Sequence, residues 1–180
     1  WNYIPLRNKV FIMATNLQLI KEASGTNVTT LSVTDCFGKG YDVYQVILNA
    51  ESDSTDGYWG LQLIDNSGST ITGSEYDEGV LLMRSYGSFI DNYSATASMV
   101  SAGYDDDYDA ALTLYVYNPD DSGSYTFGTF ATGGGTGSGL IGTKGIFVHH
   151  TAEVISGIHF KMSAGSNDFD YINVSVYGVK

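Results

Sequence analysis

Cysteine and positive charge are both scarce in this sequence of 180 residues. Cys36 is the single cysteine, so no intramolecular disulfide can form, and we expect a small buried residue there. Eight basic residues stand against 20 acidic ones, which gives a net charge of −12. Because nucleic acids and anionic membranes both attract clustered lysine and arginine, we predict no nucleic-acid partner and no membrane partner.

Long apolar runs, helical patterns and catalytic motifs are missing as well. No apolar stretch approaches the roughly 18 residues of a membrane-spanning helix, and no apolar stripe with a helical period continues beyond two turns. The sequence contains no GxSxG, CxxC or HExxH motif. The run Thr132–Gly139 is rich in glycine but lacks the Lys-Ser/Thr ending of a phosphate-binding loop, so we interpret it as a flexible loop. We therefore predict that the protein is not an enzyme and holds no cofactor.

Glycine, tyrosine and short runs typical of β-strands are abundant instead. The sequence has 22 glycines and 14 tyrosines, and 16% of its residues are charged, against about 25% in an average protein. Many short strands separated by Asn-, Asp- and Gly-rich turns are typical of a sandwich or barrel. The pattern predicts an all-β fold, an antiparallel jelly-roll-like β-sandwich of about ten strands that forms one domain over residues 13–180. We expect strands at 17–22, 28–34, 42–50, 58–65, 80–85, 88–93, 111–117, 125–131, 145–151, 158–162 and 171–179.

Alternation within the strands assigns their two faces. In the strand 111–117, Leu112, Leu114 and Val116 fall on one face, while Thr113, Tyr115 and Tyr117 fall on the other. One apolar face and one Thr/Tyr face is what a sandwich of two sheets requires. We also expect the strands at the two ends of the chain, 17–22 and 171–179, to pair with each other.

Two groups of residues are candidates for metal binding. Asp105, Asp107 and Asp109 form the densest acidic cluster and could supply oxygen ligands to Ca²⁺. Their spacing does not match an EF-hand, and a solvated acidic turn is the simpler interpretation. His149 and His150 are adjacent in a predicted strand, so they point to opposite faces and cannot bind one metal ion together. We predict that these histidines are structural or surface residues, and we predict no zinc site.

Aromatic residues are candidates for an interface. Tyrosines gather in the middle third of the chain, and tyrosine offers a large contact area with a polar tip. Cross-strand pairing inside the sheet, an interface with a partner and stacking on a sugar all remain open. Residues 1–12 are basic and aromatic, lack the continuous apolar core of a signal peptide, and are expected to form an N-terminal extension or arm. The interface candidates are Trp1, Tyr3, Tyr115 and Tyr117.

Three stretches resemble small structural proteins of tailed bacteriophages, especially marine ones. They are LQLIKEASGTNVTTLSVTDCFGKGYDVYQVILNAE (Leu17–Glu51), LQLIDNSGSTITGSEYD (Leu61–Asp77) and SGIHFKMSAGSNDFDYINVSVYGVK (Ser156–Lys180). The resemblance implies a jelly-roll-like β-sandwich in the virion, as a capsid decoration protein, head fibre, knob or tail appendage, and it implies no catalytic residues. The expected partners are capsid or other virion proteins, and further copies of the chain in a homo-oligomer. The alternative is a receptor- or carbohydrate-binding β-sandwich of a tail fibre or appendage.

Overall fold

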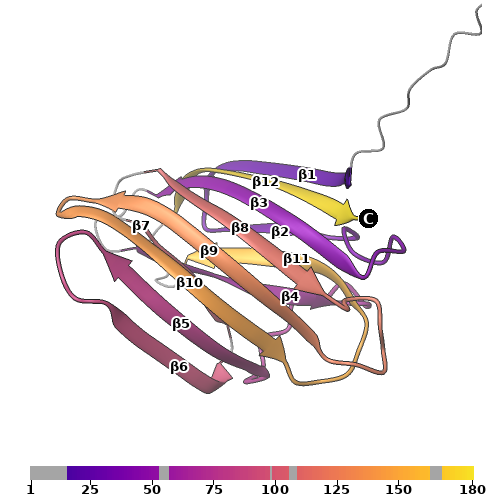
Figure 1. Cartoon of the computed structure of the whole chain (residues 1–180). Coiled ribbons are helices and arrows are strands. Elements are labelled where there is room, and N and C mark those ends of the chain that lie inside the picture. Colours follow the sequence, from indigo (N-terminus) through magenta and orange to yellow (C-terminus); the bar gives the residue numbers. More distant parts are fainter. Residues whose placement is uncertain (1–15, 53–56, 98, 106–108, 163–167) are drawn as a thin grey trace, which may run out of the picture.

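Two antiparallel β-sheets stack on each other (Figure 1). The computed structural model describes residues 16–52, 57–97, 99–105, 109–162 and 168–180. Within these ranges all regular structure is β-strand, which confirms the predicted all-β sandwich. Twelve strands are described where about ten were expected, and the jelly-roll connectivity stays a prediction. They are β1 (Leu17–Val28), β2 (Thr30–Val33), β3 (Val43–Ser52), β4 (Gly57–Asp65), β5 (Tyr76–Arg84), β6 (Ile90–Ala97), β7 (Val100–Asp105), β8 (Ala110–Tyr117), β9 (Thr126–Thr136), β10 (Gly139–His149), β11 (Ile155–Met162) and β12 (Phe169–Val179).

The two sheets differ in width. The larger sheet has eight strands in the order β1-β12-β3-β8-β9-β10-β5-β6, and the smaller has four in the order β2-β11-β4-β7. The predicted pairing of the end strands is confirmed, because β1 and β12 run antiparallel with Leu17 opposite Val179. No helix in the described ranges is long and apolar enough to span a membrane.

The core lies between the sheets and follows the predicted alternation. In β8, Leu112, Leu114 and Val116 are buried, while the intervening Tyr115 and Tyr117 are partly exposed on the outer face. Both sheets contribute large buried side chains. In the smaller sheet, the rings of Trp59 and Phe160 meet edge to face with centroids 6.5 Å apart. Burial of these apolar surfaces is the main force that holds the sheets together.

Turns form where the sequence provides residues that tolerate positive φ. Asn118 has a φ of 57° and Gly68 has a φ of 85°. The Asp121 amide donates to the Asn118 carbonyl oxygen over 3.3 Å, which closes a turn whose second residue is Pro119. Proline is favoured at that position because its ring fixes φ near −65°.

The glycine-rich run was wrongly interpreted as a flexible loop. β9 continues through Thr136 and β10 begins at Gly139, so most of the run is paired strand. The physical reason is pairing on both sides, because the run lies between β8 and β10 in the sheet and forms ladders with both strands. Elsewhere in the same pair of strands, Gly128 of β9 lies opposite Phe147 of β10, and Phe130 lies opposite Gly145. A side chain at either glycine would overlap the facing ring, so the aromatic residue fills the space that the glycine leaves free.

Candidate functional site

The outer face of the larger sheet presents a row of residues in register. Each member lies directly opposite the next on the neighbouring strand, so the row crosses all eight strands. Residues in such positions have their Cβ atoms about 5 Å apart and make direct contact across the strands. From β1 to β6 the row is Leu19, Tyr177, Gln45, Tyr115, Thr129, Ile146, Gly79 and Tyr93.

Large apolar side chains are exposed at the β6 end of this face. Ile146 is 62% exposed and Tyr93 is 87% exposed, and Phe127 and Leu81 are also exposed. Towards the middle of the sheet the aromatic side chains contact their neighbours. The Gln45 side-chain amide donates to the Tyr115 hydroxyl over 3.0 Å, and the Tyr117 and Phe127 rings stack with centroids 4.9 Å apart.

Two shallow hollows meet at Ile146. The first has a volume of about 690 Å³ and is lined by residues of β5, β6, β8, β9 and β10, including Asp91, Tyr93 and Lys144. The second has a volume of about 770 Å³ and is lined by residues that include Tyr125 and Phe127. Gly79, Thr129 and Ile146 line both hollows. We call this surface, formed by the two hollows and the row that crosses them, the outer apolar face.

The predicted interface residues fall partly on this face. Tyr115 lines the first hollow, and Tyr117 stacks beside the second on the ring of Phe127. Trp1 and Tyr3 lie outside the described residues. The interface itself stays a prediction.

The predicted calcium ligands are described only in part. Asp107 lies outside the described residues, and Asp105 is described as the last backbone position of β7. Asp109 is exposed and accepts a hydrogen bond from the Tyr171 hydroxyl. The calcium site therefore stays a prediction.

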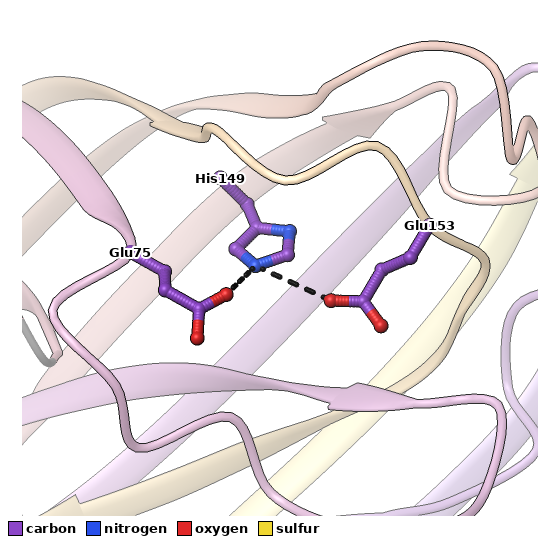
Figure 2. Close-up of side chains that lie close together, drawn as sticks. All are labelled: Glu75, His149 and Glu153. Carbon is purple, nitrogen blue, oxygen red and sulfur yellow. Dashed lines mark hydrogen bonds and ion pairs between the residues drawn. The ribbon is translucent and has the colours of Figure 1, made fainter.

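A second cluster lies where β5 begins and β10 ends. Glu75 precedes β5, His149 is the last residue of β10, and Glu153 lies in the connection from β10 to β11. Figure 2 shows both carboxylates directed at one edge of the His149 ring. His149 Nε2 lies 3.1 Å from a Glu75 carboxylate oxygen and 3.6 Å from a Glu153 carboxylate oxygen.

The imidazole of this cluster is fully buried and its carboxylates are partly exposed. The His149 side chain is 0% exposed, whereas those of Glu75 and Glu153 are 37% and 34% exposed. His149 Nδ1 is buried and has no hydrogen-bond partner. The ring packs against Tyr76, with centroids 5.5 Å apart. The buried tyrosine is itself fixed, since its hydroxyl donates to the Ile71 carbonyl and accepts from the Leu63 amide.

Glu75 is held by its own hydrogen bonds. The Thr151 hydroxyl donates to Glu75 Oε2 over 3.1 Å, and this is the same oxygen that faces His149. The backbone amide of His150 donates to the Glu75 carbonyl oxygen over 3.0 Å. The carboxylate is therefore oriented towards the imidazole by a neighbouring segment.

Sequence reasoning did not find this cluster. It correctly placed His149 and His150 on opposite faces, since His149 is buried and His150 is partly exposed near Asp77. The spacing of four residues between His149 and Glu153 is visible in the sequence and could have indicated that these two residues belong to one cluster. Glu75, however, lies 74 residues before His149 and joins it only because β5 and β10 pair with Tyr76 opposite His149.

Fold and surface together define a class of protein: an antiparallel β-sandwich that exposes an aromatic and aliphatic sheet face. No family model matches the sequence, and no curated protein matches it. Among solved structures, the chain is similar to sucrose-6-phosphate hydrolase from Lactobacillus gasseri, with 12% identity and a TM-score of 0.35, over 90% of this chain and 28% of that one. It is also similar to the marine PL-14 alginate lyase from Aplysia kurodai, with 10% identity and a TM-score of 0.37, over 88% of this chain and 81% of that one. The chain thus spans about 28% of the length of the hydrolase, and similarity at this level gives no argument about activity.

Proposed function

We propose that this chain is a non-enzymatic structural protein of a bacteriophage virion, which acts through subunit contacts made by its outer apolar face. The virion setting is an expectation from the sequence resemblance. The observation that supports subunit contacts is the outer apolar face itself, where Ile146, Phe127 and Leu81 are exposed side by side with Tyr93. Contiguous exposed apolar surface of this kind marks interaction sites in soluble proteins.

A second copy of the chain is the occupant that best suits this surface. The whole molecule carries a net charge of −12, so unassembled copies repel one another at long range. The first hollow has one lysine and one aspartate in its lining, Lys144 and Asp91. Two copies can therefore meet through the first hollow without a local excess of negative charge, and a symmetric pair would bury Ile146 of both copies. The second hollow is lined by Asp77 and Glu78 without a basic residue, so we expect the contact to centre on the first hollow.

The oligomeric state in solution tests the subunit contact. We expect sedimentation equilibrium to detect a closed oligomer of the wild-type chain, and Ile146→Asp to weaken association by about 30-fold or more, as at an interface hot spot. Leu140→Asp is the matched control, because Leu140 is exposed on the same strand but lies outside both hollows. A wild-type chain that stays monomeric at all concentrations would contradict the proposal, and so would equal effects of the two substitutions.

The virion setting needs a separate test. A mass-spectrometric inventory of purified particles from the source should contain this chain in structural quantity. Particles that lack it would exclude the virion role while leaving the subunit contact to be judged by sedimentation.

Carbohydrate binding is the second candidate, and one feature of the first hollow favours it. Tyr93 lies beside Asp91 and Asn92 in the lining, so an exposed aromatic ring is combined with hydrogen-bonding side chains. Sugar rings stack on aromatic faces and bind polar groups at their edges. A glycan array should then detect binding that Tyr93→Ala abolishes; an array without any bound glycan would count against this candidate.

A further inference from the structure

We propose that Glu75, His149 and Glu153 form a binding site for a divalent transition-metal ion of the Zn²⁺ class. The site is separate from the outer apolar face, and its existence does not depend on the proposed function. One ligand atom from each of the three residues lies within 4.8 Å of the other two. The ion would connect the start of β5, the end of β10 and the segment that follows it.

The distances from the imidazole nitrogen to the two carboxylates suit a tetrahedral ion. With metal–ligand bonds of about 2.0–2.1 Å, neighbouring ligand atoms of a tetrahedral zinc site lie about 3.3 Å apart. The two distances from His149 Nε2, 3.1 Å to Glu75 and 3.6 Å to Glu153, lie on either side of this value. The carboxylates are one-third exposed and can adjust by small rotations, and water can supply a fourth ligand from the solvent side.

The donor set selects the class of ion. One imidazole nitrogen with two carboxylates is a ligand combination that zinc and its neighbours in the transition series bind well. Calcium instead takes six to eight oxygen ligands. We therefore expect Zn²⁺ and Co²⁺ to bind at this cluster and Ca²⁺ to bind far more weakly.

Charge balance favours a divalent ion over a protonated histidine. Two glutamates face the same ring nitrogen, which can donate a single hydrogen, and the 3.6 Å distance to Glu153 is beyond hydrogen-bond length. An imidazolium would neutralise one of the two carboxylates, whereas a divalent ion neutralises both. The protonated and the metal-bound imidazole both carry a hydrogen on the buried Nδ1, which has no acceptor. The cost of this unsatisfied donor is therefore the same in both states and does not distinguish them.

The surroundings resemble those of a built metal site. Ligands of protein-bound metals are usually oriented by hydrogen bonds from a second layer of residues. Here the Thr151 hydroxyl binds the Glu75 carboxylate, and the fully buried Tyr76 supports the His149 ring. Glu75 and His149 are therefore oriented before any ion binds.

Metal titration of the tag-free full chain tests the proposal. Zn²⁺ affinity and stoichiometry are measured by competition with a chromogenic chelator, and Co²⁺ is added to record the visible absorption of a tetrahedral site. We expect one ion per chain, a rise in the thermal unfolding midpoint, and no comparable rise with Ca²⁺. An absence of stoichiometric Zn²⁺ binding at micromolar concentration would overturn the proposal.

Four substitutions locate the ion. Glu75→Gln and Glu153→Gln keep the side-chain shape and should each weaken Zn²⁺ binding by more than about 100-fold, whereas Thr151→Val should weaken it about 10- to 100-fold. Asp77→Asn is the matched control, because Asp77 follows Glu75 closely but contacts His150 outside the cluster, and it should leave binding unchanged. Circular dichroism verifies that each variant folds, and His149 is left intact because it is buried. Zn²⁺ binding that survives both glutamate substitutions, or that Asp77→Asn weakens equally, would contradict the assignment.

Discussion

Cys36 is the residue whose chemistry the fold changes most clearly. Its side chain is 0% exposed and its thiol donates to the Val33 carbonyl oxygen over 3.2 Å. Burial away from water disfavours the thiolate and raises the pKa of Cys36 to about 12. The expectation of a small buried cysteine is thereby confirmed.

This burial predicts an unreactive thiol. At pH 8 a pKa of about 12 leaves roughly one molecule in ten thousand as the nucleophilic thiolate. We expect a disulfide reagent to leave the native protein unlabelled and to react with one thiol per chain in denaturant, as followed by absorbance. Labelling should accelerate as the pH is raised, because the group loses its proton only near its high pKa. Rapid stoichiometric labelling of the native chain at pH 8 would contradict this prediction.

Paired strands depend on specific glycines, and β9 and β10 give the clearest case. The Phe130 ring lies over Gly145, so a methyl group there would overlap a buried aromatic ring. We expect Gly145→Ala to reduce the free energy of unfolding by about 1–3 kcal/mol, as overpacking does, measured by urea denaturation. Gly133→Ala is the control on β9, because no atom lies within 4 Å of the added methyl. It should be neutral or slightly stabilising, and equal destabilisation by both changes would argue against the packing explanation.

Sequence patterns predicted strands wherever large apolar residues alternate with polar ones. β8 follows this rule, and its buried and exposed faces match the prediction. β12 was predicted as a strand, and its residues also alternate between buried and exposed. β7 was missed because its sequence, VSAGYD, has few large apolar residues. The end of β9 was missed because its glycines have no side chains to form an alternating pattern, and they are held by pairing with β8 and β10, which no local pattern reveals.

The candidate site was even less accessible to sequence reasoning. Tyr115 and Tyr117 could be placed on the outer face by alternation alone. The contact between Glu75 and His149 depends on the pairing of β5 with β10, and no local pattern determines which distant strands pair. The Zn²⁺ site could therefore be proposed only after the sheet order was known.

At the scale of the whole molecule, the unequal widths of the sheets determine which surface is free. The four strands of the smaller sheet pack on one face of the eight-stranded sheet. Among the described strands, none covers the opposite face of the larger sheet. The row of residues in register on that face results from the continuous antiparallel pairing of the eight strands. A surface built from one rigid sheet is suited to repeated contacts of the same geometry.

The pairing of β1 with β12 has a topological consequence. Leu17 lies opposite Val179, and the Lys180 amide donates to the Asn16 carbonyl oxygen over 2.9 Å. A short glycine–serine bridge between these positions would close the polypeptide into a ring, which could be reopened in the exposed loop at Ser122 and Gly123. We expect such a circular permutant to unfold cooperatively with a stability within about 2 kcal/mol of the parent, as measured in urea; a non-cooperative transition would contradict this. In the parent chain, proteins or tags fused next to Leu17 and next to Val179 would project from the same corner of the sandwich. Two such tags would therefore lie side by side.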